Sequence, residues 1–348
     1  MLYPADLNEE EKDNSNLSVY WVNDDTAFGV DDNNNDLKIF VVVVKNEEVS
    51  RLHTSLPDKE VREIRRIEDK LLISTISGFY TVDLSGNIEE IFVFDKEKEK
   101  YDLPTDKELL AYYPVISDNL RYISYFILRT DETDGESIPG GKWEIILLDL
   151  HSESKTSLLS EVWVPKPSNE EVIGKCPVSF SSDSRYLYYD NSSLYINPLD
   201  YFGGRIELAT NEITEGVEKN NYHYQLHKIF DGDKVLLFEQ GPPGFRIDGF
   251  YIYDFITGQF SLCQQVDFKE ALLQNGSLFF YKTFDAAFIV NCNKLEYAEL
   301  PALQSISNFG EINEDGKLIE FTFDKDGNYQ FVILDLSEYE DTNSSANK

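Results

Sequence analysis

The stretch Cys176 to Asn197, CPVSFSSDSRYLYYDNSSLYIN, decides the fold of this chain. It alternates apolar runs with clusters of Ser, Asp and Asn, which is typical of short strands joined by tight turns. We expect a strand, a polar turn, a second strand, a tight turn at Asp190 to Ser193 and a third strand. Variants of this pattern recur along most of the sequence. The chain is therefore predicted to repeat one small unit of antiparallel sheet.

Seven such units are predicted along the 348 residues. Their apolar runs are rich in aromatic and β-branched residues, with 23 Phe and 21 Tyr in the chain, and this composition favours strands over helices. The units span residues 17–54, 61–94, 112–159, 176–210, 222–266, 268–300 and 306–336.

The seventh unit holds only three predicted strands, and the N-terminal segment MLYPADL, residues 1–7, has a suitable length for the missing one. A ring of sheets protects its edges by closing on itself. We therefore predict an all-β fold, a seven-bladed β-propeller of four-stranded antiparallel blades whose last blade is completed by the N-terminal strand. This fold forms one domain over residues 1–336, followed by an acidic and polar tail over residues 337–348.

An aspartate between apolar residues ends the third strand of several units, at Asp83, Asp149, Asp254 and Asp335. Equivalent points recur about every 48 residues, a period typical of propeller repeats. A carboxylate in this place accepts backbone hydrogen bonds in the following turn. We therefore expect these aspartates to have a structural role.

Four segments resemble the turn-and-strand motif "S-x-D-G-[KR]-x-[LI]-x-[FY]" of WD40-like propellers and of the related TolB-type and oligopeptidase-type propellers. They are ISDNLRYISYF (116–126), SSDSRYLYYD (181–190), FDGDKVLLFE (230–239) and NEDGKLIEFTFD (313–324). The Trp-Asp dipeptide of WD40 repeats is absent, so the resemblance extends to the superfamily and to no narrower family. An oligopeptidase-type relative implies a hydrolase domain after the propeller, and the chain ends where that domain would start.

The charge balance is strongly acidic, with 64 acidic against 31 basic residues and a formal net charge of -33. Such a surface repels phosphate backbones and anionic lipids, so neither nucleic acid nor a membrane is expected as a direct partner. It attracts basic proteins or peptides. Solubility of a large exposed surface is the alternative explanation.

The chain has the features of a cytoplasmic protein, or of a nuclear one in a eukaryotic cell. Its cysteines, Cys176, Cys263 and Cys292, are odd in number and lie in or beside apolar runs, as small buried hydrophobes do in a reducing compartment. The N-terminus is acidic and lacks the apolar core of a signal peptide. The longest purely apolar run, residues 39–44, is too short to span a bilayer.

No catalytic, cofactor-binding or metal-binding residue is assigned. His223 and His227 have the i, i+4 spacing of a helical metal site, but on the predicted strand they would lie roughly 13 Å apart. The Asp324 to Asn328 stretch resembles a calcium loop without its bidentate glutamate, and a hairpin turn is the favoured interpretation. Linear motifs of hydrolases, nucleotide-binding loops and zinc proteases are absent.

The sequence therefore predicts a non-catalytic platform for protein interactions that binds or chaperones a basic client. The alternatives are an enzyme, a hydrolase or lyase, whose site is built from loops at the channel mouth, and a propeller that neutralises a toxin or senses a small ligand. Aromatic or apolar loop residues and acidic loops, including the one predicted at Asp31 to Asp36, are the candidate contacts with a partner. These residues are Trp163, Val164, Pro243, Phe245, Asp31, Asp32, Asp131 and Asp134.

Overall fold

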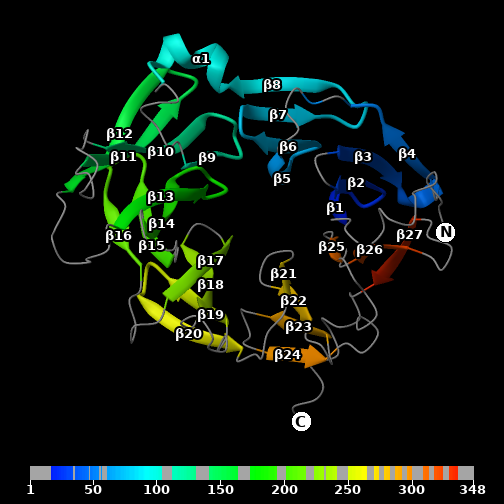
Figure 1. The fold of residues 1–348 in the computed structure, drawn as a ribbon. Helices are drawn as coiled ribbons and strands as arrows, with labels where there is room; N and C mark the ends of the chain where they lie inside the picture. The colour runs from blue at the N-terminus through cyan, green and yellow to red at the C-terminus, as the bar shows by residue number, and fades with distance from the viewer. Residues whose placement is uncertain are drawn as a thin grey trace, which may run out of the picture. The chain divides into compact units, whose positions relative to one another are not determined.

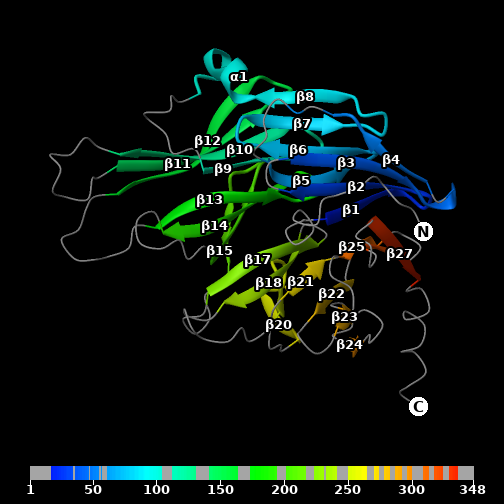
Figure 2. The ribbon, with the colours of Figure 1, turned by 45° about the vertical axis from the view of Figure 1, so that its right-hand side comes forward.

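The structure is a computed structural model, and nearly all of its regular elements are strands (Figures 1 and 2). The residues that it describes are 17–33, 36–46, 48–54, 56, 61–103, 112–130, 141–163, 173–193, 201–216, 223–230, 233–240, 250–264, 270–273, 278–282, 287–291, 296–299, 309–312, 317–323 and 329–335.

The chain divides into two compact units, which are described separately. The first comprises residues 1–95, 269–293 and 297–348, and the second comprises residues 96–268 and 294–296. The prediction of one domain over residues 1–336 is not tested by this division and stays a prediction.

The sheets of the first unit follow the chain in order, because each strand lies beside the next one in the sequence. They are β1 (Leu17–Asn23), β2 (Thr26–Asn33), β3 (Asp36–Val43) and β4 (Glu48–Leu52), with the 3-10 helix η2 (Val44–Asn46); β5 (Val61–Ile67), β6 (Lys70–Thr75), β7 (Gly78–Val82) and β8 (Ile88–Val93); β21 (Glu270–Leu273), β22 (Leu278–Lys282), β23 (Ala287–Asn291) and β24 (Glu296–Glu299); and β25 (Phe309–Ile312), β26 (Lys317–Phe323) and β27 (Tyr329–Asp335).

The second unit begins within the helix α1 (Phe94–Tyr101) and contains three sheets with the same sequential order. They are β9 (Tyr112–Ile116), β10 (Tyr122–Thr130), β11 (Gly141–Asp149) and β12 (Ser154–Trp163); β13 (Ile173–Phe180), β14 (Tyr186–Ser193), β15 (Tyr201–Glu207) and β16 (Ile213–Glu215); and β17 (His223–Phe230), β18 (Lys234–Gln240), β19 (Phe250–Asp254) and β20 (Gln259–Gln264).

The core lies between neighbouring sheets, and the first half of β14 shows why a strand can be apolar on both faces. Its Leu187 and Tyr189 join a buried cluster with β9 to β12, whereas Tyr186 and Tyr188 join a cluster with β17 to β20. Because successive side chains of a strand point to opposite faces, one strand serves two cores. A third cluster packs the sheet of β1 to β4 against that of β5 to β8.

The predicted turn motif is confirmed at Ser181 to Arg185. The Ser181 hydroxyl donates to Oδ1 of Asp183 at 2.6 Å, and the backbone N–H of Arg185 donates to the same oxygen at 3.0 Å. Ser184 takes a positive φ of 57° that completes the turn. The hydroxyl of Ser117 and the amide oxygen of Asn119 repeat the first bond at 2.7 Å.

The structure corrects the prediction of seven blades, because in the part of the chain that it describes, five four-stranded blades are complete. These five are β1–β4, β5–β8, β9–β12, β13–β16 and β17–β20, each with described register across all four strands and described core side chains. In the β21–β24 sheet, register is described only from β21 to β23. The sheet of β25 to β27 has three strands. The N-terminal strand expected at residues 1–7 and the tail at 337–348 lie outside the described residues.

Two segments predicted as a turn or a loop are strand where the structure describes them. Residues 190–193 continue β14 and pair with Cys176 to Ile173, and β2 continues through Asp31 to Asn33. In both places, the backbone ladder with the neighbouring strand outweighs the turn preference of Asp, Asn and Ser, because tertiary pairing overrides local propensity.

The charged segment that follows β8 begins with the helix α1. Phe94 packs against Phe79 and Phe92, with ring centroids 6.2 and 5.2 Å apart. Within the part of the chain that the structure describes, no helix is both long and apolar enough to cross a membrane.

Candidate binding pocket

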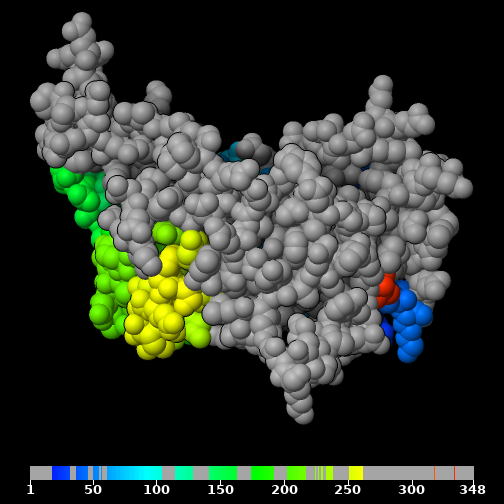
Figure 3. Space-filling view, turned by 90° about the horizontal axis from the view of Figure 1, so that it is seen from below, coloured from blue at the N-terminus to red at the C-terminus, as the bar shows by residue number. Residues whose placement is uncertain are grey.

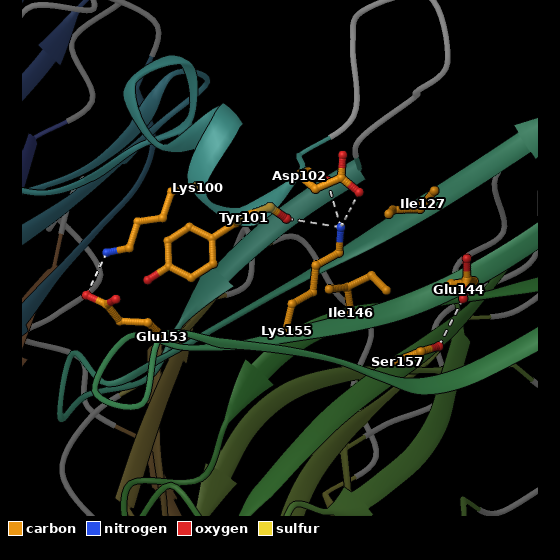
Figure 4. A pocket seen from close by; sticks show the side chains of 9 residues that line it. All are labelled: Lys100, Tyr101, Asp102, Ile127, Glu144, Ile146, Glu153, Lys155 and Ser157. Atoms are coloured by element: carbon orange, nitrogen blue, oxygen red, sulfur yellow. Dashed lines mark hydrogen bonds and ion pairs between the residues drawn. The ribbon is translucent and has the colours of Figure 1, made fainter.

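A cavity of about 480 Å³ lies beside the end of α1, against the sheet of β9 to β12 (Figure 4). This volume suits a small ligand or one side chain of a partner with its neighbours. Its lining combines aliphatic, acidic and basic groups. The lining residues are Lys100, Tyr101, Asp102, Ile127, Glu144, Ile146, Glu153, Lys155 and Ser157.

The floor of the cavity follows from the strand register. Ile127 on β10 lies opposite Glu144 on β11, and Ile146 lies opposite Ser157 on β12. Glu144 and Ile146 are two residues apart on one strand, so they share a face of the sheet. Ile127 and Ile146 are buried, and they form an apolar patch beside a carboxylate.

One wall of the cavity is the C-terminal end of α1, and Lys155 caps this end of the helix. The Lys155 ammonium donates to the backbone carbonyls of Tyr101 at 3.1 Å and of Asp102 at 2.7 Å. Those carbonyls lie at the negative end of the helix, where a cation is stabilising. Lys100 on the helix pairs with Glu153 at 2.9 Å. Both lysines of the lining are therefore engaged by the protein itself, as Figure 4 shows.

Glu144 provides the inner carboxylate of the cavity, and its side chain is 12% exposed. The hydroxyl of Ser157 donates to its Oε1 at 3.0 Å, and Nζ of Lys142 lies 3.0 Å from the same atom. These contacts hold the carboxylate in one orientation. The arrangement can bind an amphipathic cation, since an aliphatic stem fits the floor and a positive head fits Glu144.

Several basic side chains elsewhere in the described blades lie against acidic neighbours. Arg205 is the most buried of them, and its guanidinium lies 3.9 Å from the ring centre of Tyr186 and 2.9 Å from Oδ1 of Asp233. Burial raises the pKa of the neighbouring Tyr188 to about 12 despite the opposing effect of Arg205. Further ion pairs join Lys70 to Glu89, Arg121 to Asp149, Lys175 to Glu215, Arg185 to Glu207 and Lys234 to Asp254.

The predicted partner-binding residues are not brought together by the described part of the structure. Asp31 is buried in β2, with Lys38 at 3.9 Å, so it is not the exposed loop carboxylate that we expected. Asp32 lies on the same strand. Trp163 is the last residue of β12 and pairs with Gly141. The preceding residue, Val162, is 68% exposed. The others, Val164, Asp131, Asp134, Pro243 and Phe245, lie outside the described residues. A role of these residues in binding stays a prediction.

Of the other two motifs, the Asp324 to Asn328 stretch lies outside the described residues, and the histidine pair is described. His223 and His227 lie on β17, a strand as predicted. Among the described residues, no group of three or more His, Cys, Asp or Glu could hold a metal ion. Figure 3 shows the described residues around β19 and β20 in yellow. Ile256, in the turn between these two strands, is 74% exposed.

Sequence reasoning missed the pocket. One signal was the charged segment from Asp95 to Glu108, which lies between two predicted units. The alternation of Lys142, Glu144 and Ile146 on one face of a strand was a second signal, but only the tertiary structure shows that α1 ends beside this face.

Comparison with solved structures reveals the same architecture elsewhere. An oligogalacturonate lyase from Vibrio parahaemolyticus is similar, with a TM-score of 0.60 and 10% identity over 94% of this chain and 91% of that chain. An oligogalacturonate lyase in complex with manganese is similar with a TM-score of 0.61 and 10% identity, over 92% and 89% of the two chains. The fold is a β-propeller. The predicted resemblance to the propeller superfamily is thus confirmed at the level of fold.

An acylaminoacyl peptidase from Pyrococcus horikoshii also matches, with a TM-score of 0.53 and 11% identity over 92% of this chain and 51% of that chain. TolB structures are among the weaker matches. No protein-family model and no curated protein sequence matches the chain.

Proposed function

We propose that this propeller is a non-catalytic protein that binds a basic protein partner. The observation that carries the proposal is the charge balance. If every one of the 31 basic residues paired with one acidic residue, an excess of 33 acidic residues would still remain. The ion pairs of the described blades support this reasoning, because basic side chains there are turned toward acids of the protein itself.

An excess of this size acts over a distance and not only by contact. Charges of one sign raise the rate at which an oppositely charged partner associates, and salt screens the effect. The Debye length falls from about 30 Å at 0.01 M salt to about 8 Å at physiological ionic strength. Binding that depends on the acidic surface must therefore weaken steeply as salt is added.

The test is affinity isolation with the full chain at low salt, identification of the bound protein, and titration of the purified pair over a series of salt concentrations. We expect a basic partner whose affinity falls at least tenfold between about 0.05 and about 0.5 M NaCl. An acidic or neutral partner, or an affinity that stays constant across the series, would contradict the proposal.

The second candidate is a lyase, and the similarity to oligogalacturonate lyases over nearly the whole chain favours it. The net charge of -33 argues against it, because a polyanionic substrate would be repelled. Incubation with oligogalacturonate, with and without Mn²⁺, followed by ultraviolet absorption of the unsaturated product, separates the two candidates. We expect no product, and a catalytic increase in absorption would establish the lyase instead.

A further inference from the structure

We propose that the pocket beside α1 binds a single lysine or arginine side chain of the basic partner, and this inference rests on the proposed function. The partner segment lies across β12, and one of its basic side chains enters the cavity. The head group meets Glu144, and the aliphatic stem contacts Ile127 and Ile146.

The floor suits the stem of such a side chain. Lysine and arginine carry several methylene groups, which gain free energy when they leave water for an apolar surface. Ile127 and Ile146 lie on adjacent strands of one sheet face and supply that surface. An acidic patch without this floor would attract a cation without selecting its shape.

Glu144 suits the head group because its position is already set. Ser157 holds one carboxylate oxygen at 3.0 Å, so little conformational entropy is lost when a ligand binds. Lys142 shows that an ammonium fits beside this oxygen. The Lys142 side chain is 43% exposed and does not line the cavity, so a partner's cation can share or replace its contact at little cost.

The lysines of the lining have partners within the wall on the helix side. Lys155 directs its ammonium to the two carbonyls at the end of α1, and Lys100 pairs with Glu153. They therefore close the wall on the helix side. Asp102 adds a second carboxylate at the mouth: its side chain is fully exposed, and its Oδ2 lies 3.9 Å from Nζ of Lys155. An incoming cation meets Asp102 first and Glu144 at the inner end.

The experiment compares Glu144→Gln with Glu161→Gln, which removes the same charge from the same blade. Glu161 is exposed on β12 and lies opposite Trp143, so it belongs to the other face of the sheet. The probe is a fluorescein-labelled peptide of arginine, glycine and serine, and a peptide with citrulline in place of arginine reports neutral binding. We expect Glu144→Gln to weaken arginine-peptide binding about tenfold and Glu161→Gln less than about twofold.

A second measurement does not depend on any variant folding. In the wild-type protein with labelled isoleucine methyl groups, the arginine peptide should shift the signals of Ile127 and Ile146 and leave that of Ile73 unchanged. Asp102→Asn serves as a second variant, because asparagine tolerates the positive φ of 47° at this position. We expect it to weaken binding about twofold to threefold.

The outcomes distinguish the two proposals. If the wild-type protein fails to bind the arginine peptide, or binds the citrulline peptide equally well, the proposed function fails. If it binds the arginine peptide in a salt-dependent way, but Glu144→Gln equals Glu161→Gln and the two methyl signals stay in place, the pocket is not the site and the proposed function stands.

Discussion

Arg121 donates two hydrogen bonds to Asp149, from Nε to Oδ1 at 3.0 Å and from Nη2 to Oδ2 at 2.6 Å. Arg121 is the basic residue of the repeated turn motif, and Asp149 ends the third strand of the same blade. Arg185 and Glu207 repeat the pair in the next blade, with 2.9 Å between Nε and Oε1. The two repeated features of the sequence thus interact, and each pair joins the second strand of a blade to the third.

Asp149→Asn tests this pair through the pH dependence of stability. Hydrogen bonds from Arg121 and from backbone N–H groups hold the pKa of Asp149 well below its ordinary value of 3.8. A lowered folded-state pKa stabilises the native state above the unfolded-state pKa, and the contribution is lost as pH falls toward the folded value. We expect the variant to lose about 1–2 kcal/mol at neutral pH. This difference should shrink below about pH 4.

Urea unfolding followed by circular dichroism from about pH 7 to about pH 3 provides the measurement. Glu161→Gln serves as the control for loss of one negative charge. The free energies of unfolding of wild type and Asp149→Asn are compared at each pH. If they differ as much at about pH 3 as at neutral pH, the ionised carboxylate is not the source of the difference.

Gly204→Ala should destabilise the blade of β13 to β16. Gly204 has a φ of 143°, and a Cβ there would lie 2.3 Å from the backbone oxygen of Thr214. The neighbouring strand must then shift, at a cost of about 2–4 kcal/mol. Gly258→Ala is the matched control, since its φ of 66° is also positive but nothing lies within 4 Å of the added Cβ. Thermal unfolding should show a clearly larger loss for Gly204→Ala, and equal losses would refute the steric explanation.

Arg205 should stabilise the packing of two neighbouring blades. Its side chain is 8% exposed, and its guanidinium lies 4.2 Å from the ring centre of Phe255 as well as against Tyr186. We expect Arg205→Ala to cost about 2–4 kcal/mol, because packing and the contact with Asp233 are lost together. Arg205→Lys should cost less than Arg205→Ala because the positive charge stays. It should still destabilise the protein, because lysine cannot stack its head group on the two rings.

Chemical denaturation of the two Arg205 variants, with Asp233→Asn as the control, measures these costs. Asp233 is 34% exposed, so its own loss should be small. If Asp233→Asn costs as much as Arg205→Ala, the ion pair rather than the aromatic packing accounts for the effect.

Lys155→Met should loosen the end of α1 without unfolding the blade. Lys155 Nζ caps the carbonyls of Tyr101 and Asp102, and the N–H of Leu103 donates to the carbonyl of Lys98 at 2.9 Å. Loss of a charged cap costs about 0.5–1 kcal/mol, which corresponds to roughly twofold to fivefold faster local opening. Hydrogen exchange measured by mass spectrometry should show faster exchange over residues 98–103. Lys142→Met is the control. If this variant accelerates exchange over residues 98–103 as much as Lys155→Met does, the effect comes from the loss of a positive charge in general.

Much of each blade could be predicted from local sequence. Asp83 and Asp254 accept backbone N–H bonds in the turns that follow them, as expected from their position at strand ends. The turn at Ser181 to Arg185 was equally predictable, since its hydrogen bonds join residues close in the chain. The number of complete blades could not be predicted in this way, because a strand-like run of sequence does not reveal whether a fourth strand pairs with the other three.

The candidate site was less predictable than the fold. Asp31 has the composition of a loop around it, yet it is buried because β2 and β3 pair as far as Asn33 and Asp36. In the sequence, nothing distinguishes Glu144 and Lys155 from ordinary exposed charged residues of a hairpin. Their role depends on which face of the sheet α1 covers, and no local pattern encodes that.

The sequence by itself determined the antiparallel strand units, their turn motif and the excess of negative charge, because these depend on composition and on contacts between near neighbours. Only the tertiary structure decided which sheets have four strands and which charges are buried. It also decided that the end of α1 and one face of β10 to β12 enclose a pocket. The reason is physical: side chains distant in sequence meet only when backbone pairing and core packing have set the faces of the sheets.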